Sequence, residues 1–202
     1  MRRRPGPAAA PDDDAAVIRS SRRDPELFAV LFDRHAPHIY RYLARRVGRQ
    51  VADDLVAETF LAAFAKRDRY DLGHPDARPW LYGIATNLVN QQRRDEVRQY
   101  RIKQASTAEP EVPGPAERVA ADVTAQAMRP LLTAALAALA AGDRDVLLLI
   151  AWEQLTYREV SRALGIPVGT VRSRLNRARR KVRQVLAGTD AATTYEELTT
   201  NE

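Results

Sequence analysis

Residues 165–183, GIPVGTVRSRLNRARRKVR, concentrate positive charge on one short stretch of the chain. Its basic side chains are Arg172, Arg174, Arg177, Arg179, Arg180, Lys181 and Arg183, and the stretch contains no acidic residue. Like charges four residues apart on a helix repel each other, and surface helices usually relieve this repulsion by mixing both signs. The unrelieved charge favours a polyanionic partner, because guanidinium, hydroxyl and amide groups can bind DNA phosphates and base edges.

The same stretch carries an apolar ladder that predicts an ordered helix. At 100° per residue, one face of this helix is formed by Val171, Leu175, Ala178, Val182 and Val185. The opposite face carries Gly169, Ser173, Asn176, Arg177 and Arg180. Small residues at the start of the helix would let its backbone approach a DNA groove.

The residues just before this helix complete the spacing of a helix-turn-helix. TYREVSRAL, residues 156–164, predicts a short amphipathic helix capped by Thr156. Gly165 supplies the turn, where a positive φ is easiest for glycine. Pro167 stands near the start of the next helix, where its missing N–H costs little. Because the major groove admits one helix of this kind, the segment predicts a DNA-binding module.

A second set of residues, in the first half of the chain, has the chemistry of single-stranded nucleic-acid binding. Its members are Trp80, Tyr82, Asn87, Arg93, Arg94 and Arg98. Aromatic rings stack on unpaired bases, and cations follow the nucleic-acid backbone. Trp80 and Tyr82 could equally be core aromatics, and the sequence leaves both interpretations open.

The segment DDLVAETFLAAFAKR predicts a helix with two different faces, beginning at Asp53 and Asp54. Its buried stripe is expected to be Val56, Phe60 and Ala63. Its outer face then carries Asp54, Glu58 and Leu61. An exposed leucine beside two acids fits a protein-binding surface with an apolar anchor and a polar rim, although single exposed leucines are also common.

The composition excludes several classes of function. The chain has 202 residues, a formal net charge of +6 and no cysteine, so disulfides, thiol catalysis and cysteine-based zinc sites are excluded. His35, His38 and His74 do not form a metal constellation, and no cofactor is expected. No nucleophile–base set or phosphate loop supports an enzyme. No stretch has the length of a signal peptide core or a membrane span, so we expect a soluble intracellular protein.

We expect an all-α fold of two small helical domains joined by a flexible linker, because helical periodicity dominates the chain. The expected order is a disordered N-terminal arm over 1–24, a first domain over 25–104, a Pro-rich linker over 105–118, a helix-turn-helix domain over 119–187 and a flexible tail over 188–202. The linker could instead be a surface loop within one domain. Asp143 is a plausible cap for the helix that follows Gly142.

These motifs resemble those of one known family. YREVSRALGIPVGTVRSRLNRARRKVR resembles region 4 of bacterial RNA polymerase sigma factors of the extracytoplasmic-function (ECF) group. DDLVAETFLAAF resembles region 2.2, which docks on the clamp helices of the polymerase, and RPWLYGIATNLVNQQRR resembles regions 2.3 and 2.4, which melt and read the minus-10 promoter element. The resemblance covers about residues 25 to 186. It departs at Ala57 and Gln91, where the family often has Gln and Asp.

The resemblance implies a non-enzymatic, cytoplasmic sigma factor that binds core RNA polymerase, recognises promoter DNA and helps to melt it. Contacts with the minus-35 element are then expected from Thr170, Arg172, Ser173, Arg174, Asn176, Arg177 and Arg180. Contacts with the minus-10 element are expected from Trp80, Tyr82, Asn87, Asn90, Arg93 and Arg94. Polymerase binding is expected from Asp54, Glu58 and Leu61. An anti-sigma factor is a further expected partner.

Two other functions remain open from the residues alone. A stand-alone helix-turn-helix regulator would bind its DNA site tightly without the polymerase. A helical adaptor or enzyme with an incidentally basic helix would show no salt-dependent DNA binding.

Overall fold

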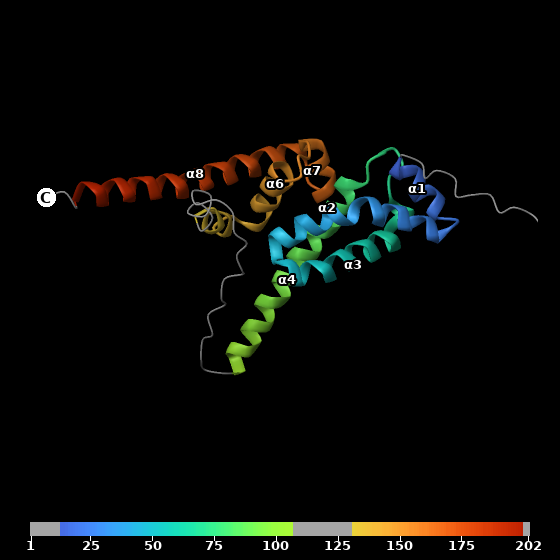
Figure 1. Ribbon diagram of the computed structural model, residues 1–202, viewed down its shortest axis with the longest axis horizontal. Helices are drawn as coiled ribbons and strands as arrows, with labels where there is room; N and C mark the ends of the chain where they lie inside the picture. The colour runs from blue at the N-terminus through green and yellow to red at the C-terminus, as the bar shows by residue number, and fades with distance from the viewer. Residues whose placement is uncertain (1–12, 107–130, 200–202) are drawn as a thin grey trace, which may run out of the picture. The chain divides into compact units, whose positions relative to one another are not determined.

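The computed structural model describes the backbone of residues 13–106 and 131–199 of the 202-residue chain, and the side chains of residues 13–99 and 131–187. Within those ranges every regular element is a helix (Figure 1), as the periodicity predicts. The chain divides into two compact units, Met1–Pro113 and Gly114–Glu202. Most of the predicted linker, residues 107–118, lies outside the described residues, whereas residues 105 and 106 still belong to the last helix of the first unit.

The first unit is a helical bundle. Its elements are α1 (Asp14–Ser21), the short 3-10 helix η1 (Pro25–Phe28), α2 (Ala29–Val47), α3 (Arg49–Lys66), the 3-10 turn η2 (Arg67–Arg69) and α4 (Arg78–Ser106). Helices α2, α3 and α4 pack side by side (Figure 1). Their shared core consists of Leu31, Ile39 and Leu43 from α2, Val56, Phe60 and Ala63 from α3, and Leu81, Ala85 and Val89 from α4. The predicted buried stripe of α3 is therefore confirmed.

Helix α3 begins earlier than the sequence predicts. Gly48, with φ +88° and ψ 164°, separates α2 from α3, and α3 starts at Arg49. Asp53 and Asp54 therefore lie in the second turn of α3 rather than at its start. Favourable interaction with the helix dipole is strongest in the first turn, so these two carboxylates do not act as a helix-start signal.

The N-terminal arm is shorter than predicted. Residues 14–21 form helix α1, capped by Asp13, whose side chain accepts a hydrogen bond of 2.8 Å from the Ala15 N–H. Val17 and Ile18 of α1 are buried. The prediction of disorder through residue 24 is wrong for this segment, because burial of this apolar pair against the bundle outweighs the polar composition around it. Residues 1–12 lie outside the described residues.

The second unit carries the helix-turn-helix. It contains a helix over residues 131–137, then α6 (Ala141–Ala151), α7 (Tyr157–Leu164) and α8 (Val168–Thr199). Its core is built from Val146, Leu149, Val160, Val171, Leu175 and Ala178. The last three residues are members of the ladder predicted for the basic helix, whereas Val182 and Val185 further along it are half-buried.

Local sequence explains the turn between α7 and α8. Thr156 and Glu159 form a capping box at the start of α7, in which each side chain accepts a hydrogen bond from the backbone N–H of the other residue. Gly165 ends α7 in the left-handed region, at φ 63° and ψ 34°. Its conformation lets the Ile166 N–H reach the Ser161 carbonyl at 3.1 Å. Pro167 directly precedes the first residue of α8, as the sequence predicts.

The structure corrects one sequence expectation for this unit and shows how far α8 extends. Asp143 does not cap α6, because the helix begins at Ala141 and its capping position is Ala140; Asp143 is the third residue of the helix. Helix α8 continues through Thr199, so it includes most of the segment 188–202 for which the sequence predicts a flexible tail. A single glycine such as Gly188 costs a helix only about 1 kcal/mol relative to alanine, and no proline follows to stop it.

Candidate nucleic-acid and protein-binding surfaces

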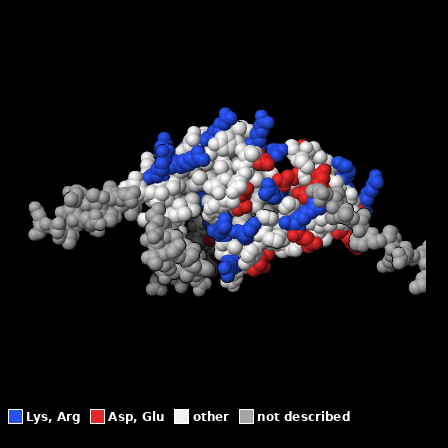
Figure 2. Space-filling model, turned by 45° about the horizontal axis from the view of Figure 1, so that its top comes forward, with Lys and Arg blue, Asp and Glu red and all other residues white. Residues whose placement is uncertain are grey.

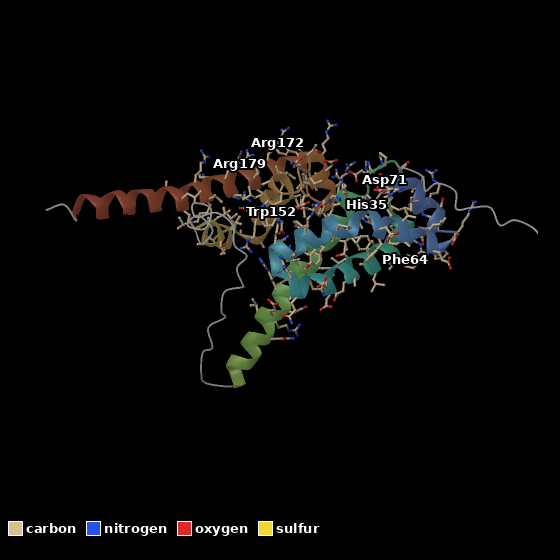
Figure 3. The ribbon with its side chains drawn as sticks, in the orientation of Figure 1. His35, Phe64, Asp71, Trp152, Arg172 and Arg179 are labelled. Carbon is tan, nitrogen blue, oxygen red and sulfur yellow. The ribbon has the colours of Figure 1, made fainter. Side chains whose placement is uncertain are left out.

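The outward face of α8 presents most of the predicted DNA-contacting side chains. Arg172, Ser173, Asn176, Arg177 and Arg180 are exposed, and Thr170 and Arg174 are half-buried. The surface over α8 shows several projecting basic side chains in Figure 2, and Arg172 and Arg179 point away from the helix in Figure 3. The inward ladder of α8 forces this arrangement, because residues not on the buried line must face solvent.

Two of these side chains are held by contacts within the second unit. The Ser173 hydroxyl donates a hydrogen bond of 3.0 Å to the Thr170 carbonyl, which leaves its oxygen able to accept. The Arg174 guanidinium lies against the backbone at Gly142, where a Cβ would stand only 2.6 Å from Arg174 Nη1. The start of α6 therefore approaches α8 closely at this point, and glycine leaves the room for the arginine.

Arg177 is paired with a carboxylate. Its Nε donates to Asp143 Oδ2 at 3.0 Å and its Nη2 donates to Asp143 Oδ1 at 2.8 Å. The hydrogen bonds from Arg177, and the opposite charge of Asp143, raise the pKa of the guanidinium above its ordinary value. Asp143 could not be recognised as a site residue from the sequence, since it lies 34 positions from Arg177 and resembles a helix cap.

The predicted minus-10 residues of α4 fall into an outward group and an inward group. Asn87, Asn90 and Arg94 are spaced three and four residues apart and share one side of α4, where Asn87 and Arg94 are exposed and Asn90 is half-buried. Arg93 is half-buried and donates a hydrogen bond of 3.2 Å to the Arg46 carbonyl. Asn87, Asn90 and Arg94 thus form an amide-rich, basic strip along the outward side of α4.

The two aromatic residues at the start of α4 are not equivalent. Tyr82 is only 2% exposed and packs edge-on against Tyr42, with ring centroids 5.3 Å apart. The structure therefore corrects the expectation that Tyr82 stacks on DNA: it lies on the buried face of α4, where a base cannot reach it. Trp80 is half-buried and packs against Tyr70 at 4.9 Å.

The Asp14 carboxylate holds the loop before α4 in place, although the sequence predicts this residue to lie in a disordered arm. Asp14 is 5% exposed and accepts hydrogen bonds from His35 Nε2 at 2.8 Å, from the Ala77 N–H at 2.9 Å and from Arg34 Nη1 at 3.0 Å. Burial alone would raise the pKa of Asp14, but the three hydrogen bonds and the charge of His35 outweigh it and lower the pKa. The Asp14 N–H also donates to the Pro75 carbonyl.

The outer face of α3 exposes the three side chains that the sequence assigns to a protein-binding surface. Asp54 and Glu58 are exposed, and Leu61 is 68% exposed, although Phe60 beside it is only 6% exposed. Phe32 of α2 is 45% exposed and makes an edge contact with Phe60, at 4.9 Å between ring centroids. Exposed leucine and phenylalanine side chains on adjacent helices, beside two acids, suit a partner that offers apolar and cationic groups.

Within the described ranges, no cluster of three or more histidine, aspartate or glutamate residues is arranged to hold a metal ion. No helix there is long and apolar enough to cross a membrane.

The fold is all-α, with a basic helix-turn-helix in one unit and an amide-rich basic strip in the other. These features are typical of a DNA-binding protein that contacts DNA through two separate domains. Sequence comparison identifies both modules: residues 31–99 match the family described as "Sigma-70 region 2", and residues 129–182 match "Sigma-70, region 4". The chain therefore belongs to the sigma-70 family, and within it to the ECF-type RNA polymerase sigma factors. These proteins are non-enzymatic and initiate transcription through RNA polymerase binding and promoter recognition.

Individual relatives agree with this assignment. The chain is 34% identical over 164 residues to the RNA polymerase sigma factor CarQ of Myxococcus xanthus, covering 80% of this chain and 90% of CarQ. It is 31% identical over 174 residues to the ECF sigma factor SigL of Mycobacterium tuberculosis, covering 85% of this chain and 96% of SigL. Among solved structures, it is similar to the sigma factor RpoE crystallised with the anti-sigma factor NepR from Bartonella quintana, with 25% identity, a TM-score of 0.59 and coverage of 79% and 96%.

Proposed function

We propose a division of promoter contacts between the two units. The exposed face of α8 reads the minus-35 element, with Ser173, Asn176 and Arg177 directed at base edges and Arg172, Arg174 and Arg180 directed at phosphates. Thr170, half-buried at the same end of α8, lies at the margin of this contact. Hydrogen-bonding side chains on the outer face of one helix are what readout in the major groove requires.

The strip on α4 binds the minus-10 element. Asn87, Asn90 and Arg94 lie along it and supply amide and cationic groups for a strand that must be unpaired to be read. Arg93, half-buried and bonded to the Arg46 carbonyl, lies at the inner margin of this contact. Trp80, still partly accessible, stands at the N-terminal end of the strip beside the loop that Asp14 holds. Tyr82 has no direct role in this contact and stabilises the core through Tyr42.

Polymerase docking is assigned to Asp54, Glu58 and Leu61 of α3. The observation that carries this assignment is the 68% exposure of Leu61 on a helix whose opposite face is buried. A large apolar side chain that contributes nothing to the core gains free energy only when a partner covers it. The two carboxylates beside it provide the polar rim of such an interface.

Substitution of Leu61 by arginine tests the docking surface. Leu61→Arg places a cation at the anchor, and loss of a buried anchor typically costs about 2 kcal/mol or more, or roughly 30-fold in affinity. Because Leu61 faces solvent, the fold should survive. We expect near-normal circular dichroism and thermal melting, with loss of core polymerase binding in a native-gel or fluorescence assay and loss of promoter-specific transcription.

A matched control separates this effect from a general effect of added charge. Val97 is 51% exposed on α4 and lies outside the proposed docking surface, so Val97→Arg should leave polymerase affinity close to wild type. Unchanged polymerase affinity in a folded Leu61→Arg protein would remove this surface from the mechanism.

We also infer that the protein works in the cytoplasm, where its polymerase and DNA lie, and that an anti-sigma factor controls it. The anti-sigma inference is supported by the fold shared with the Bartonella quintana sigma factor, which was crystallised with NepR. Co-purification of the tagged full chain from its own cells, with and without Leu61→Arg, tests whether such a partner exists and whether it shares the α3 surface with the polymerase.

A further inference from the structure

The pair formed by Asp143 and Arg177 connects the start of α6 with the exposed face of α8. Two hydrogen bonds, of 3.0 and 2.8 Å, join the Asp143 carboxylate to Nε and Nη2 of the guanidinium. The Arg177 side chain is 52% exposed and the Asp143 side chain only 12%. The carboxylate therefore lies beneath the guanidinium, on its protein side, while the arginine still reaches solvent.

This geometry leaves part of the guanidinium unused. Arginine has five N–H donors in a planar fork, and Asp143 engages Nε–H and one Nη2–H. The two Nη1–H groups and the second Nη2–H group are left, and together they form the outer edge of the fork. That edge can donate two parallel hydrogen bonds to the O6 and N7 acceptors of a guanine in the major groove.

Asp143 is itself firmly held. It is the third residue of α6, and its N–H donates to the Ala140 carbonyl at 3.0 Å. Its neighbour Arg144 fixes the beginning of α6, because its guanidinium donates to the carbonyls of Leu136 and Leu139 at 2.7 and 2.9 Å. A carboxylate in the first turn of a helix is also favoured by the helix dipole. The support for Arg177 is thus rigid.

We propose that Asp143 is a specificity-determining residue, which orients Arg177 so that its outer edge reads a guanine in the upstream promoter element. This inference rests on the proposed function, in which α8 reads the minus-35 element. A free arginine side chain loses considerable rotamer freedom when it binds, and a pre-oriented one loses less. Asp143 touches no DNA in this role and acts only through Arg177.

The same carboxylate also reduces non-specific binding. A neutralising partner weakens the attraction of Arg177 for phosphates at any sequence, because phosphate binding depends on unpaired charge. Base readout requires donors that are held in a fixed orientation, so it benefits from the pairing of Arg177 with Asp143. We therefore expect Asp143 to favour base recognition by Arg177 over attraction to phosphates. Loss of Asp143 should weaken base recognition and strengthen non-specific binding.

The test compares Asp143→Asn with wild type in the full-length chain bound to core RNA polymerase. Asparagine keeps the shape but turns an NH2 group toward the arginine donors. A duplex promoter library randomised over the upstream element is selected with each holoenzyme, and a shuffled duplex of equal length measures non-specific binding of the free chain. We expect Asp143→Asn to lose preference at one base pair by about tenfold, while non-specific affinity rises and its logarithmic salt slope steepens by about 0.9.

Two further variants show whether Asp143 acts through Arg177. Arg177→Ala should lose preference at the same base pair, and adding Asp143→Asn to Arg177→Ala should change that preference no further. Arg172→Ala removes an exposed arginine of the same helix and should weaken binding evenly across the library. Thermal melting of each variant checks the fold. If Asp143→Asn unfolds the second unit, Arg177→Lys replaces it, since lysine keeps the charge but lacks the fork.

Three results would overturn the inference. The first is an unchanged base preference in a folded Asp143→Asn protein, which would mean that the pair is purely structural. The second is an equal gain in affinity for all sequences, which would mean that Asp143 only competes with DNA. The third is an equally strong change of preference in the Arg177→Ala background, which would mean that Asp143 acts by another route. A wild-type holoenzyme without any upstream base preference would instead refute the proposed minus-35 function, and this inference with it.

Discussion

Asp14 is a single carboxylate that joins three parts of the first unit. It accepts hydrogen bonds from α2, through Arg34 and His35, and from the loop before α4, through the Ala77 N–H. These donors lie 20 to 63 positions away in sequence. The buried carboxylate is stable there because three donors and two cationic or protonatable neighbours offset the cost of removing its charge from water.

Asp14→Asn should destabilise the first unit by about 2 kcal/mol at neutral pH, because hydrogen bonds to a buried charged acceptor are lost. The folded-state pKa of Asp14 is lowered from its ordinary value of 3.8. Its contribution to stability is therefore complete above that value and is lost as the pH falls through the lower folded-state pKa. The free energy of unfolding is measured by urea unfolding followed by circular dichroism, in steps from about pH 7 to about pH 3. The difference between wild type and variant should become small only at the acid end of this range.

The control for this experiment is Asp33→Asn. Asp33 is an exposed carboxylate on α2, next to Arg34, and its substitution should change the free energy of unfolding little at any pH. If the difference in free energy of unfolding between wild type and Asp14→Asn stayed constant over the whole pH range, the role of the Asp14 charge would be contradicted.

At the scale of single elements, α7 is short, and its stability depends on its capping interactions and on the burial of one face. It has eight residues, and an isolated helix of that length is unstable in water. Its amphipathic face buries Val160 against the rest of the unit, and the capping box at Thr156 satisfies its first backbone donors. Because α7 supports the turn that sets the angle of α8, weakening its cap should affect the DNA-binding element without touching any DNA contact.

Thr156→Ala should cost about 1 kcal/mol, the usual loss for an N-cap substitution. For a unit of this size, that change lowers the melting temperature by roughly 4–8 °C. Thr156→Ser keeps the hydroxyl acceptor and should remain near wild type. Differential scanning calorimetry of the full chain measures both variants. Equal melting temperatures for the alanine and serine variants would mean that the hydrogen bond from the Glu159 N–H contributes nothing.

At the scale of the whole molecule, the proposed promoter contacts are distributed over two units, and we expect the contacts of each unit alone to be weak. The net charge of +6 attracts DNA of any sequence. The proposed base readers are few: three side chains on α8 and a short strip on α4. We therefore expect discrimination between promoters to require both units to act together on the polymerase, which would hold them at a fixed spacing and raise the local concentration of DNA.

The free chain should accordingly bind duplex DNA weakly and with little sequence preference. Its affinity should fall steeply with salt, each phosphate contact adding about 0.9 to the logarithmic slope. Addition of core polymerase should produce site-specific protection and run-off transcripts from the same templates. Footprinting and transcription at several salt concentrations measure both. Tight, sequence-specific binding by the free chain would contradict this division of labour and would fit a stand-alone regulator.

The sequence by itself determined most of the helices and which of their faces are exposed. The ladder of Val171, Leu175 and Ala178 specifies which face of α8 is buried, since helical periodicity is a local property. The same reasoning places Leu61 outward and Phe60 inward on α3. Gly165 and Thr156 mark the turn and the cap because their conformational and hydrogen-bonding preferences act within a few residues.

Only the tertiary structure decided how distant residues are paired. Asp14 looked like part of a disordered acidic arm and Asp143 like a helix cap, but each meets partners that no local pattern places beside it. Tyr82 carries both a stacking ring and an apolar core surface, and only the packing of α4 against α2 shows that the ring is buried against Tyr42. Periodicity identifies the face on which a residue lies, but the partner across that face depends on how the helices pack, and that is a property of the folded chain.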